Sequence, residues 1–381
     1  MNWAHRLLHF TPEIEPIIAS PLIVKNEFYD PDRRFLHSPF QYQYPADEWS
    51  FSDRQLQIAK AAVKIPLLYK FWLQRQIKQI KPSVLHIHFG NVAWEYSRLA
   101  VKADVPLIAT FHGYDYRKIL RDKPVFSKRY KQLFARAAAI TCGGSDAKNY
   151  LISIGCPAAK INIVHMAIDT EKVLYRPPQK KRNELKLLQI SSFVEKKGHI
   201  YTLRAFKKAL AVCPNMTLTL IGEFVDEEIL RMVSSHINAE GLEEKVEIIG
   251  SLSYSELLRR IPRYDVMIHP SVTAADTDME CTPVSMMDVQ AVGLPVITTR
   301  HADIPEVVLH GKTGMLAEEK DTDTLTEYIH FFYKADTEAF TEYAEAARRH
   351  IEKEYDVRKS AAQFAELYRK VSRGATANNV V

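Results

Sequence analysis

Short apolar runs alternate with longer amphipathic stretches along most of the chain. Apolar runs bounded by Gly, Pro or polar residues predict buried strands, and apolar residues three or four positions apart predict the helices between them. Strands that alternate with helices imply a mostly parallel sheet covered on both faces. In the first half we expect strands at residues 16–24, 83–88, 106–111 and 139–142, and helices at residues 2–10, 53–80, 92–102 and 129–137.

The second half shows the same alternation. Residues 169–182 contain Pro177-Pro178 and are the natural linker between the halves. A chain of 381 residues is long enough for two domains, so the pattern predicts two α/β domains. We expect strands at residues 185–191, 216–222, 246–250, 266–269, 295–299 and 314–316, with helices between them and closing helices at residues 335–349 and 358–371.

Composition narrows the class of protein. Apolar residues make up 46% of the chain, which is enough for two cores, and charged residues make up 25%. No apolar run reaches the length of about 18 residues that a membrane-spanning helix needs. The four cysteines form no C-x-x-C pair, which argues against a disulfide framework or a zinc site. We therefore expect a cytoplasmic protein with free thiols.

Positive charge is concentrated in the first half. Residues 1–170 hold 23 of the 51 Lys and Arg residues but only 14 of the 46 Asp and Glu residues. Basic residues crowd residues 117–136 and residues 60–81, where they alternate with aromatic and aliphatic residues. A basic helix of this kind can lie on an anionic membrane surface or meet a charged lipid-linked substrate. The basic segment can equally be an ordinary amphipathic helix packed on its own domain. Nucleic-acid binding is less favoured, because no recognised nucleic-acid-binding module accompanies the charge.

Two carboxylates stand eight positions apart, at Glu280 and Asp288, around a predicted helix start. Pro283 suits the first helical position, residues 284–292 would form a short helix, and Gly293 suits the position just past its end. Amides at the start of that helix would face the loop that carries Glu280 and could hold a diphosphate. Asp288 would lie roughly 7.5 Å further along the helix axis. This spacing fits a nucleotide sugar, with sugar hydroxyls on Glu280 and ribose hydroxyls on Asp288.

The alternative is a solvated loop acid followed by an acid on a helix surface. The residues around Asp288 are almost all apolar, however, so this helix is predicted to be buried nearly all round. A buried carboxylate needs a partner, which favours a bound ligand.

The stretch from His269 to Val308 resembles the E-x7-E signature of retaining family-4 glycosyltransferases, especially the bacterial branch that builds exopolysaccharides of the colanic-acid type. It departs at Cys281, where glycine is usual, and at Asp288, where glutamate is usual. The resemblance covers nearly the whole chain. It implies the α/β GT-B fold, in which two Rossmann-like domains with parallel sheets face each other across a cleft. The family's first N-terminal strand is expected to be missing, since residues 2–10 look like the helix that follows it.

The resemblance also implies how the domains divide the chain. Residues 1–170 would form the acceptor-binding domain, and residues 171–355 would form the domain that binds the nucleotide sugar. Residues 356–371 would form a helix that crosses back to the first domain, and residues 372–381 would be a disordered tail.

In the first domain, Thr110-Phe111-His112-Gly113-Tyr114-Asp115 resembles the family's T-x-H-G-x-D pattern. His112 follows a buried strand, at the edge where α/β proteins bind ligands. The resemblance implies that His112 and Glu280 are the catalytic residues and that His112 orients the sugar; the alternative is a histidine that caps the loop. His86 and His88 are expected to face opposite ways, so they do not suggest a metal pair. The acceptor side is expected to comprise His88, Gly90, Tyr114 and Asp115.

In the second domain, residues 191–199 follow a predicted strand and open a helix, which is an anion-binding arrangement. Lys197 would place a positive charge on the diphosphate, or it is an ordinary surface lysine. Ser192 stands where the family usually has arginine, which reduces the positive charge available to the leaving group. The expected donor-binding residues are Ser192, Lys197, Leu252, Thr282, Pro283, Val284 and Asp288.

Asp276-Thr277-Asp278 spells D-x-D, but two acids in a loop are a weak magnesium site, and we expect neither a metal nor a cofactor.

The resemblance implies transfer of a hexose, with retention, from a nucleotide-diphosphate sugar to a polyprenyl-diphosphate-linked saccharide. The enzyme would then be peripheral on the inner face of the cytoplasmic membrane. Two alternatives remain, namely a non-catalytic scaffold or binding subunit, and another GT-B enzyme such as a sugar-nucleotide epimerase or phosphorylase.

Overall fold

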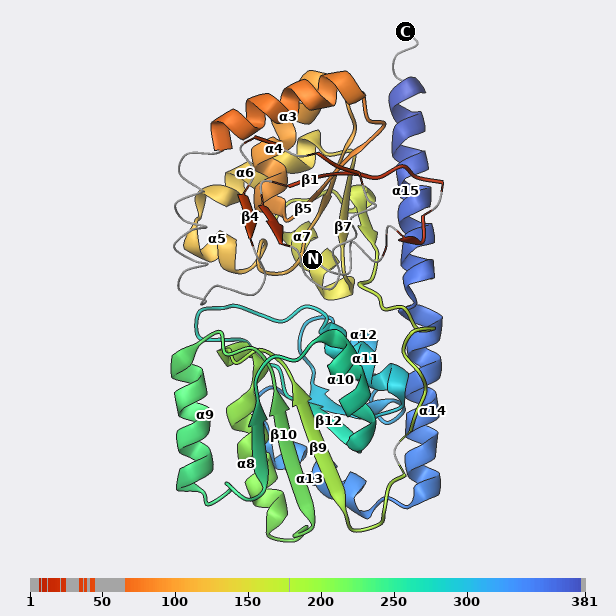
Figure 1. The fold of residues 1–381 in the computed structure, drawn as a ribbon. Helices are drawn as coiled ribbons and strands as arrows, with labels where there is room; N and C mark the ends of the chain where they lie inside the picture. The colour runs from red at the N-terminus through yellow and green to blue at the C-terminus, as the bar shows by residue number, and fades with distance from the viewer. Residues whose placement is uncertain are drawn as a thin grey trace.

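The computed structural model describes residues 66–177 and 179–377 and several short stretches before them, namely residues 7, 9–11, 13–20, 22–24, 34–36, 38–39 and 42–44. Figure 1 shows two α/β units, one above the other, and a C-terminal helical segment that runs beside both. Within the described residues no helix is long and apolar enough to cross a membrane.

The first unit is built on a four-stranded parallel sheet with the order β5-β6-β7-β8. Both β6 and β7 are buried along their whole length, as is typical of a parallel sheet. The strands are β5 (Leu85–His88), β6 (Leu107–Thr110), β7 (Ala139–Cys142) and β8 (Ile161–Ile163). The helices are α3 (Pro66–Ile80), α4 (Gly90–Ala103), α5 (Lys118–Asp122), α6 (Val125–Arg136) and α7 (Ser145–Ser153), with a 3-10 turn at Ala158–Lys160.

The N-terminal strands differ from the expectation. The strand expected at residues 16–24 is divided into β1 (Ile17–Ala19) and β2 (Leu22–Val24). They pair with β3 (Arg34–Leu36) and β4 (Tyr42–Tyr44) in two separate two-stranded sheets, so neither joins the four-stranded sheet. Most of the helix expected at residues 2–10 and the part expected at residues 53–65 lie outside the described residues.

The second unit contains a six-stranded parallel sheet with the order β11-β10-β9-β12-β13-β14. The order reverses between β9 and β12, and α/β proteins bind ligands at such a switch point. The strands are β9 (Leu185–Ile190), β10 (Met216–Ile221), β11 (Val246–Ile249), β12 (Val266–His269), β13 (Val296–Thr299) and β14 (Gly314–Ala317). The helices are α8 (His199–Leu210), α9 (Glu227–Ala239), α10 (Tyr254–Arg260), α11 (Val284–Val292), α12 (Ile304–Val307) and α13 (Thr322–Lys334), with 3-10 turns at Glu195–Lys197 and Ile261–Arg263.

Successive residues of β9 face two different cores. Leu187 belongs to the cluster that contains Phe206 of α8 and Ile329 of α13. Leu188 belongs to the cluster that contains Val289 of α11. Both leucines are fully buried, because residues alternate between the faces of a strand and helices cover both faces of this sheet.

The last two helices, α14 (Thr337–Glu354) and α15 (Val357–Ala377), follow one another beside the two units (Figure 1). Helix α14 packs on the second unit, whereas α15 returns to the first, where Leu367 packs with Ile108 and Ala139 of the sheet. The backbone of α15 continues to residue 377, beyond residue 372, where we expected disorder to begin. Extending an existing helix adds a hydrogen bond for each ordered residue, which favours this continuation.

Candidate active site

A cavity of about 100 Å³ lies between the two units. The first unit contributes His112 and Tyr116 to its lining, and the second contributes Glu280, Cys281 and Thr282. His112 follows β6, and Glu280 lies in the loop between β12 and α11, so both stand beyond the carboxyl ends of parallel strands. The structure therefore brings together the two residues that the sequence singled out as catalytic.

Glu280 is paired with Lys197, from the loop that follows β9. The Lys197 ammonium contacts the Glu280 carboxylate, and the two side chains are 14% and 13% exposed. Burial, and after it the neighbouring Lys196 ammonium, lower the pKa of Lys197 to about 7. Lys197 is thus a buried residue of the site, not the ordinary surface lysine considered as the alternative.

A histidine fixes the backbone at Glu280. Nε2 of the buried His301 accepts the Glu280 N–H at 3.0 Å, and Nδ1 of His301 lies 2.6 Å from Oε1 of Glu319. Nδ1 therefore carries the proton, and this neutral ring agrees with the pKa of His301, which burial lowers. The Glu319 carboxylate also accepts the N–H and hydroxyl of Thr273. The sequence assigned no role to His301 or Glu319, and the only signal for them was their place just after two parallel strands.

Helix α11 begins at Val284, as the sequence predicts, but Pro283 lies just before the helix and not at its first position. Its ψ of 115° is extended, so it is the flanking residue, and it supplies no capping side chain. Gly293 ends the helix with φ 111°. Oγ1 of Thr282 is buried and has no hydrogen-bond partner within the described part of the chain. An unpaired hydroxyl beside a helix start can bind a ligand oxygen.

Asp288 is buried in α11, as its apolar neighbours indicate, and its Oδ1 accepts a hydrogen bond from the Tyr254 hydroxyl at 2.8 Å. It does not line the cavity that Glu280 lines. Leu252 and Val284, two further residues expected on the donor side, pack against the core of the second unit. The contact with Tyr254 could not be foreseen, because Tyr254 belongs to a different helix.

The loops that follow β9 and β12 meet at a glycine. Gly198 has φ 68°, and a Cβ atom there would lie 1.9 Å from the carbonyl oxygen of Pro270. Only glycine allows this approach, which brings Lys197 to the loop of Glu280. Ser192 is half-buried in the same β9 loop, and its carbonyl accepts the N–H of Val194 at 3.0 Å.

Asp115 holds the His112 loop against the start of α4. Its buried carboxylate accepts the N–H groups of Gly90 at 2.5 Å and His112 at 2.8 Å. Burial raises the pKa of Asp115 to about 6, although these amides favour the charged form. Gly90 and Asp115, both expected on the acceptor side, are buried, and their hydrogen bonds position the loop that carries His112. Tyr114, which was also expected on the acceptor side, is 45% exposed.

His112 belongs to a row of three histidines. Nδ1 of His88 lies 3.1 Å from Nε2 of His112, and the ring centres of His86 and His88 are 4.5 Å apart. The expectation that His86 and His88 face opposite ways is wrong, because residues two apart on a strand project from the same face. Burial lowers the pKa of His112 to about 3, so this ring is neutral at neutral pH.

Both acids of the D-x-D sequence are engaged by lysines. Asp276 forms an ion pair with Lys118 of α5. Asp278 lies 3.0 Å from the ammonium of Lys196. The first pair joins the two units, and the second supports the loop that leads to Glu280.

Two acids that follow β13 join the units at a second place. Oδ1 of Asp303 accepts the N–H of Asp146, and Oε1 of Glu306 accepts that of Ser145, both at 2.8 Å. These amides begin α7, where the helix dipole favours negative charge. The contacts close the two units around the cavity.

Family models match both halves of the chain. The model for glycosyl transferases group 1 matches residues 172–350, and the model for Glycosyltransferase Family 4 matches residues 37–172. AmsK, an amylovoran biosynthesis glycosyltransferase of Erwinia amylovora, is 30% identical over 305 residues, which cover 77% of this chain and 72% of AmsK. WcaL of Escherichia coli K12, named for colanic acid biosynthesis, is 28% identical over 293 residues, which cover 75% of this chain and 70% of WcaL.

Solved structures share the architecture. A glycosyltransferase from Rickettsia africae aligns with a TM-score of 0.76 at 17% identity, over 97% of this chain and 93% of that one. HepE of Anabaena, solved with UDP, aligns with a TM-score of 0.68 at 16% identity, over 79% of this chain and 82% of that one. The chain therefore belongs to the family-4, group 1 glycosyltransferases, which transfer a sugar from a nucleotide sugar, and it has the GT-B fold.

Proposed function

We propose that the protein is a retaining hexosyltransferase that moves a sugar from a nucleoside-diphosphate donor to a lipid-linked saccharide during synthesis of a bacterial surface polysaccharide. The observation that supports this best is the cavity to which His112 comes from one unit and Glu280 from the other. A transfer needs its two substrates side by side, and a cavity between two domains offers one wall to each.

The diphosphate of the donor would lie between the start of α11 and Lys197. Helix-terminal amides and a buried ammonium both stabilise the negative charge that develops on a leaving diphosphate. During transfer the bond from the anomeric carbon to the diphosphate oxygen breaks, and a bond from that carbon to an acceptor hydroxyl oxygen forms. The proton of that hydroxyl would pass to the departing diphosphate oxygen. Glu280 would exchange its contact with Lys197 for hydroxyl groups of the transferred sugar.

His112 would orient the sugar and would not act as a general base. With a pKa of about 3, its ring is a poor acceptor of a proton at neutral pH. A neutral imidazole can still form hydrogen bonds to hydroxyl groups. The contact with His88 would set the direction of the ring.

The donor would enter by separation of the two units. A cavity of about 100 Å³ is smaller than the roughly 300–1,000 Å³ of ordinary ligand sites. The contacts of Asp303 with the Asp146 amide and of Lys118 with Asp276 would break on opening and form again on closure. Closure of this kind excludes water from the reaction.

Three finer features complete the proposal. HepE was solved with UDP-glucose, and this makes UDP-glucose the first donor to test. The reaction would need no metal, since each acid of the D-x-D sequence is engaged by a lysine. The basic residues of the first unit would hold the protein on an anionic membrane, where a lipid-linked acceptor resides.

Release of nucleoside diphosphate from a panel of nucleotide sugars tests the proposal. We expect turnover by the wild type with at least one donor, with and without EDTA. Glu280→Gln should lower turnover about 10²- to 10³-fold, as is usual when a group that stabilises the transition state is removed, while the protein remains folded. Glu318→Gln is the matched control, because that carboxylate is 74% exposed.

Two outcomes would favour the alternatives. Donor binding without turnover in both the wild type and Glu280→Gln would indicate a binding or scaffold subunit. Consumption of inorganic phosphate in place of an acceptor saccharide would indicate a phosphorylase.

A further inference from the structure

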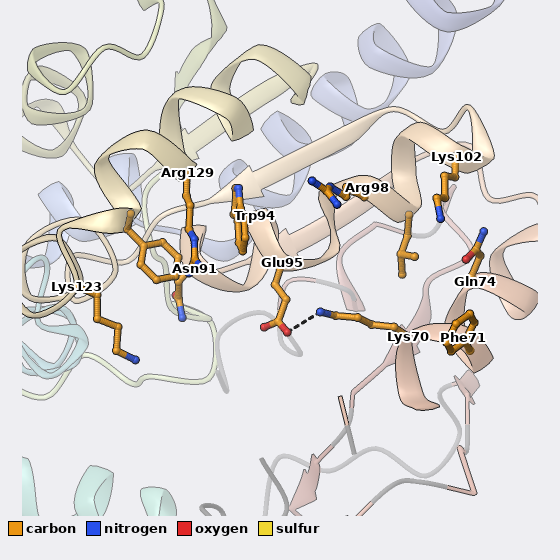
Figure 2. Close-up of a pocket in the computed structure, with 12 residues that line it drawn as sticks. Lys70, Phe71, Gln74, Asn91, Trp94, Glu95, Arg98, Lys102, Lys123 and Arg129 are labelled. Atoms are coloured by element: carbon orange, nitrogen blue, oxygen red, sulfur yellow. Dashed lines mark hydrogen bonds and ion pairs between the residues drawn. The ribbon is translucent and has the colours of Figure 1, made fainter. Parts of the chain in front are cut away.

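A second cavity, of about 710 Å³, lies on the first unit and shares no lining residue with the cavity between the units. It is a groove bounded by α3, α4 and the start of α6 (Figure 2). Its volume falls within the roughly 300–1,000 Å³ of ordinary ligand sites.

The groove carries unbalanced positive charge. Its single acid, Glu95, is already paired with Lys70 at 2.7 Å, and Figure 2 shows these two side chains reaching toward one another. The remaining cations would attract an anion with more than one negative charge. Four cations of the lining have no ion-pair partner among the described residues, namely Arg98, Lys102, Lys123 and Arg129.

One of these cations is held in place by aromatic rings. The Arg129 guanidinium lies 4.2 Å from the ring centre of Trp94 and 4.9 Å from that of Phe126. The indole N–H of Trp94 is fixed in turn by Gln132, at 3.3 Å. A stacked guanidinium keeps its N–H edge available, and that edge fits a phosphate or carboxylate.

Exposed apolar side chains flank the charged groove. Phe71 lines it and is 65% exposed. Leu68, Val101 and Val125 are each more than half exposed, and each lies within one helical turn of lining residues on α3, α4 or α6. Positive charge within the groove and apolar surface at its rim together fit an amphiphile with a strongly anionic head.

We propose that the groove binds the diphosphate headgroup of a lipid-linked saccharide, with the hydrocarbon chain over Phe71. A single phosphodiester would leave most of the four cations unpaired, whereas a diphosphate supplies enough charge and oxygen atoms for them. This inference rests on the proposed function and assigns a place to the lipid carrier of its acceptor.

The groove is connected to the candidate active site through the backbone. Asn91 lines the groove and directly follows Gly90, whose N–H is bound by Asp115. The same carboxylate holds the N–H of His112. A headgroup in the groove would therefore lie on the unit that presents His112, and its saccharide could extend toward the cavity.

Isothermal titration of the full chain with farnesyl diphosphate, a short polyprenyl diphosphate, tests this assignment. Arg98→Gln/Lys102→Gln should bind the probe at least about a hundredfold more weakly, because two charge-assisted contacts are lost. The control is Lys128→Gln/Lys131→Gln, which removes the same charge from exposed positions of α6 outside the groove, and it should bind as the wild type does. Farnesol, which has no phosphate, should bind weakly to all three proteins.

Several results would overturn the assignment. Equal binding by the groove variant and the wild type would do so, and so would an equal loss in the control variant. A loss in Lys197→Gln but not in the groove variant would place the diphosphate at the donor site. Equal retention of all the proteins on phosphatidylglycerol vesicles, together with no binding of the probe, would indicate a general membrane surface.

Different measurements test the groove assignment and the proposed function, so either one can be wrong while the other holds. Release of nucleoside diphosphate by the wild type without any acceptor measures donor chemistry alone. If release is absent for every donor, with an acceptor saccharide as well as without one, while the groove binds the probe, only the proposed function fails. If release occurs and the groove variant binds as the wild type does, only the groove assignment fails.

Discussion

Nε2 of His301 accepts the backbone N–H of Glu280 at 3.0 Å, while the opposite side of the same ring meets the Glu319 carboxylate at 2.6 Å. His301 follows β13 and Glu319 follows β14, so the contacts connect the Glu280 loop to the rigid sheet. His301 is 1% exposed and does not line the cavity between the units. It is therefore a positioning residue that acts through Glu280.

His301→Phe should lower turnover and leave the KM for the donor nearly unchanged. The variant keeps a ring of similar size but leaves the Glu280 N–H unpaired, which costs about 1–3 kcal/mol of stability. The measurement is a double-mutant cycle of turnover with Glu280→Gln. If His301 acts only through Glu280, its loss adds nothing in the Glu280→Gln background; losses that multiply would show an independent role.

Affinity for a nucleotide sugar should fall as pH rises above about 7. Lys197 has a pKa of about 7 in the free protein, and a bound diphosphate stabilises its ammonium and raises that pKa. Below this pKa the lysine is already charged, so affinity is flat. Above it, binding must take up a proton, and affinity falls by at most about tenfold per pH unit. Titration calorimetry with UDP-glucose between about pH 6 and 9 measures the slope.

Two variants isolate the contribution of Lys197. Lys197→Arg remains charged over the whole range and should flatten the profile. Lys197→Met should bind weakly at every pH. A slope that survives in Lys197→Met would assign the titration to another group.

Local patterns predicted the parts of the site that depend on neighbouring residues. The Pro283 to Gly293 segment predicted helix α11, its end at Gly293 and its burial, because helix signals and apolar periodicity lie within a few residues of each other. The apolar runs likewise predicted every strand of the six-stranded sheet, and β5, β6 and β7 of the four-stranded sheet, but not the short strand β8. The ion pair of Lys197 with Glu280 was not predicted, because it depends on the strand order, which puts the loops after β9 and β12 together.

Contacts between distant elements could not be predicted from the chain alone. The pairs His301–Glu319 and Tyr254–Asp288 join different elements, and no periodicity links their positions. The burial of Asp115 was missed for a related reason, since a carboxylate after a strand suggests a ligand contact until its amide partners are seen. The N-terminal strands were misplaced because apolar runs do not reveal which strands pair.

Ser192→Arg should strengthen donor binding. Ser192 is half-buried in the loop that follows β9, which also carries Lys197, and an arginine there would add a cation near the proposed diphosphate. One charge-assisted contact is worth about 1.5–3 kcal/mol, which corresponds to at least a tenfold lower Kd. Titration with UDP-glucose measures the gain. An unchanged Kd would count against a phosphate at this loop. Glu223→Arg, at an exposed position, is the control and should leave the Kd unchanged.

Asp288 is expected to recognise the donor ribose, although it does not line the cavity in the closed protein. The wild type should bind UDP-glucose about tenfold more tightly than its 2′,3′-dideoxyribose analogue, since a hydroxyl bound to a carboxylate contributes roughly this much. Asp288→Asn should bind the two equally. A preference that survives in Asp288→Asn would place the ribose elsewhere.

Tyr254→Phe separates recognition of the ribose from support of the helix. Removing the hydroxyl that donates to Asp288 at 2.8 Å should destabilise the protein by about 1–3 kcal/mol, because a buried carboxylate loses a partner. The preference for the ribose donor should remain, because both carboxylate oxygens of Asp288 are kept. Denaturant unfolding and the same pair of titrations measure the two effects. Loss of the preference in Tyr254→Phe, with Asp288 intact, would show that Tyr254 itself contacts the nucleotide.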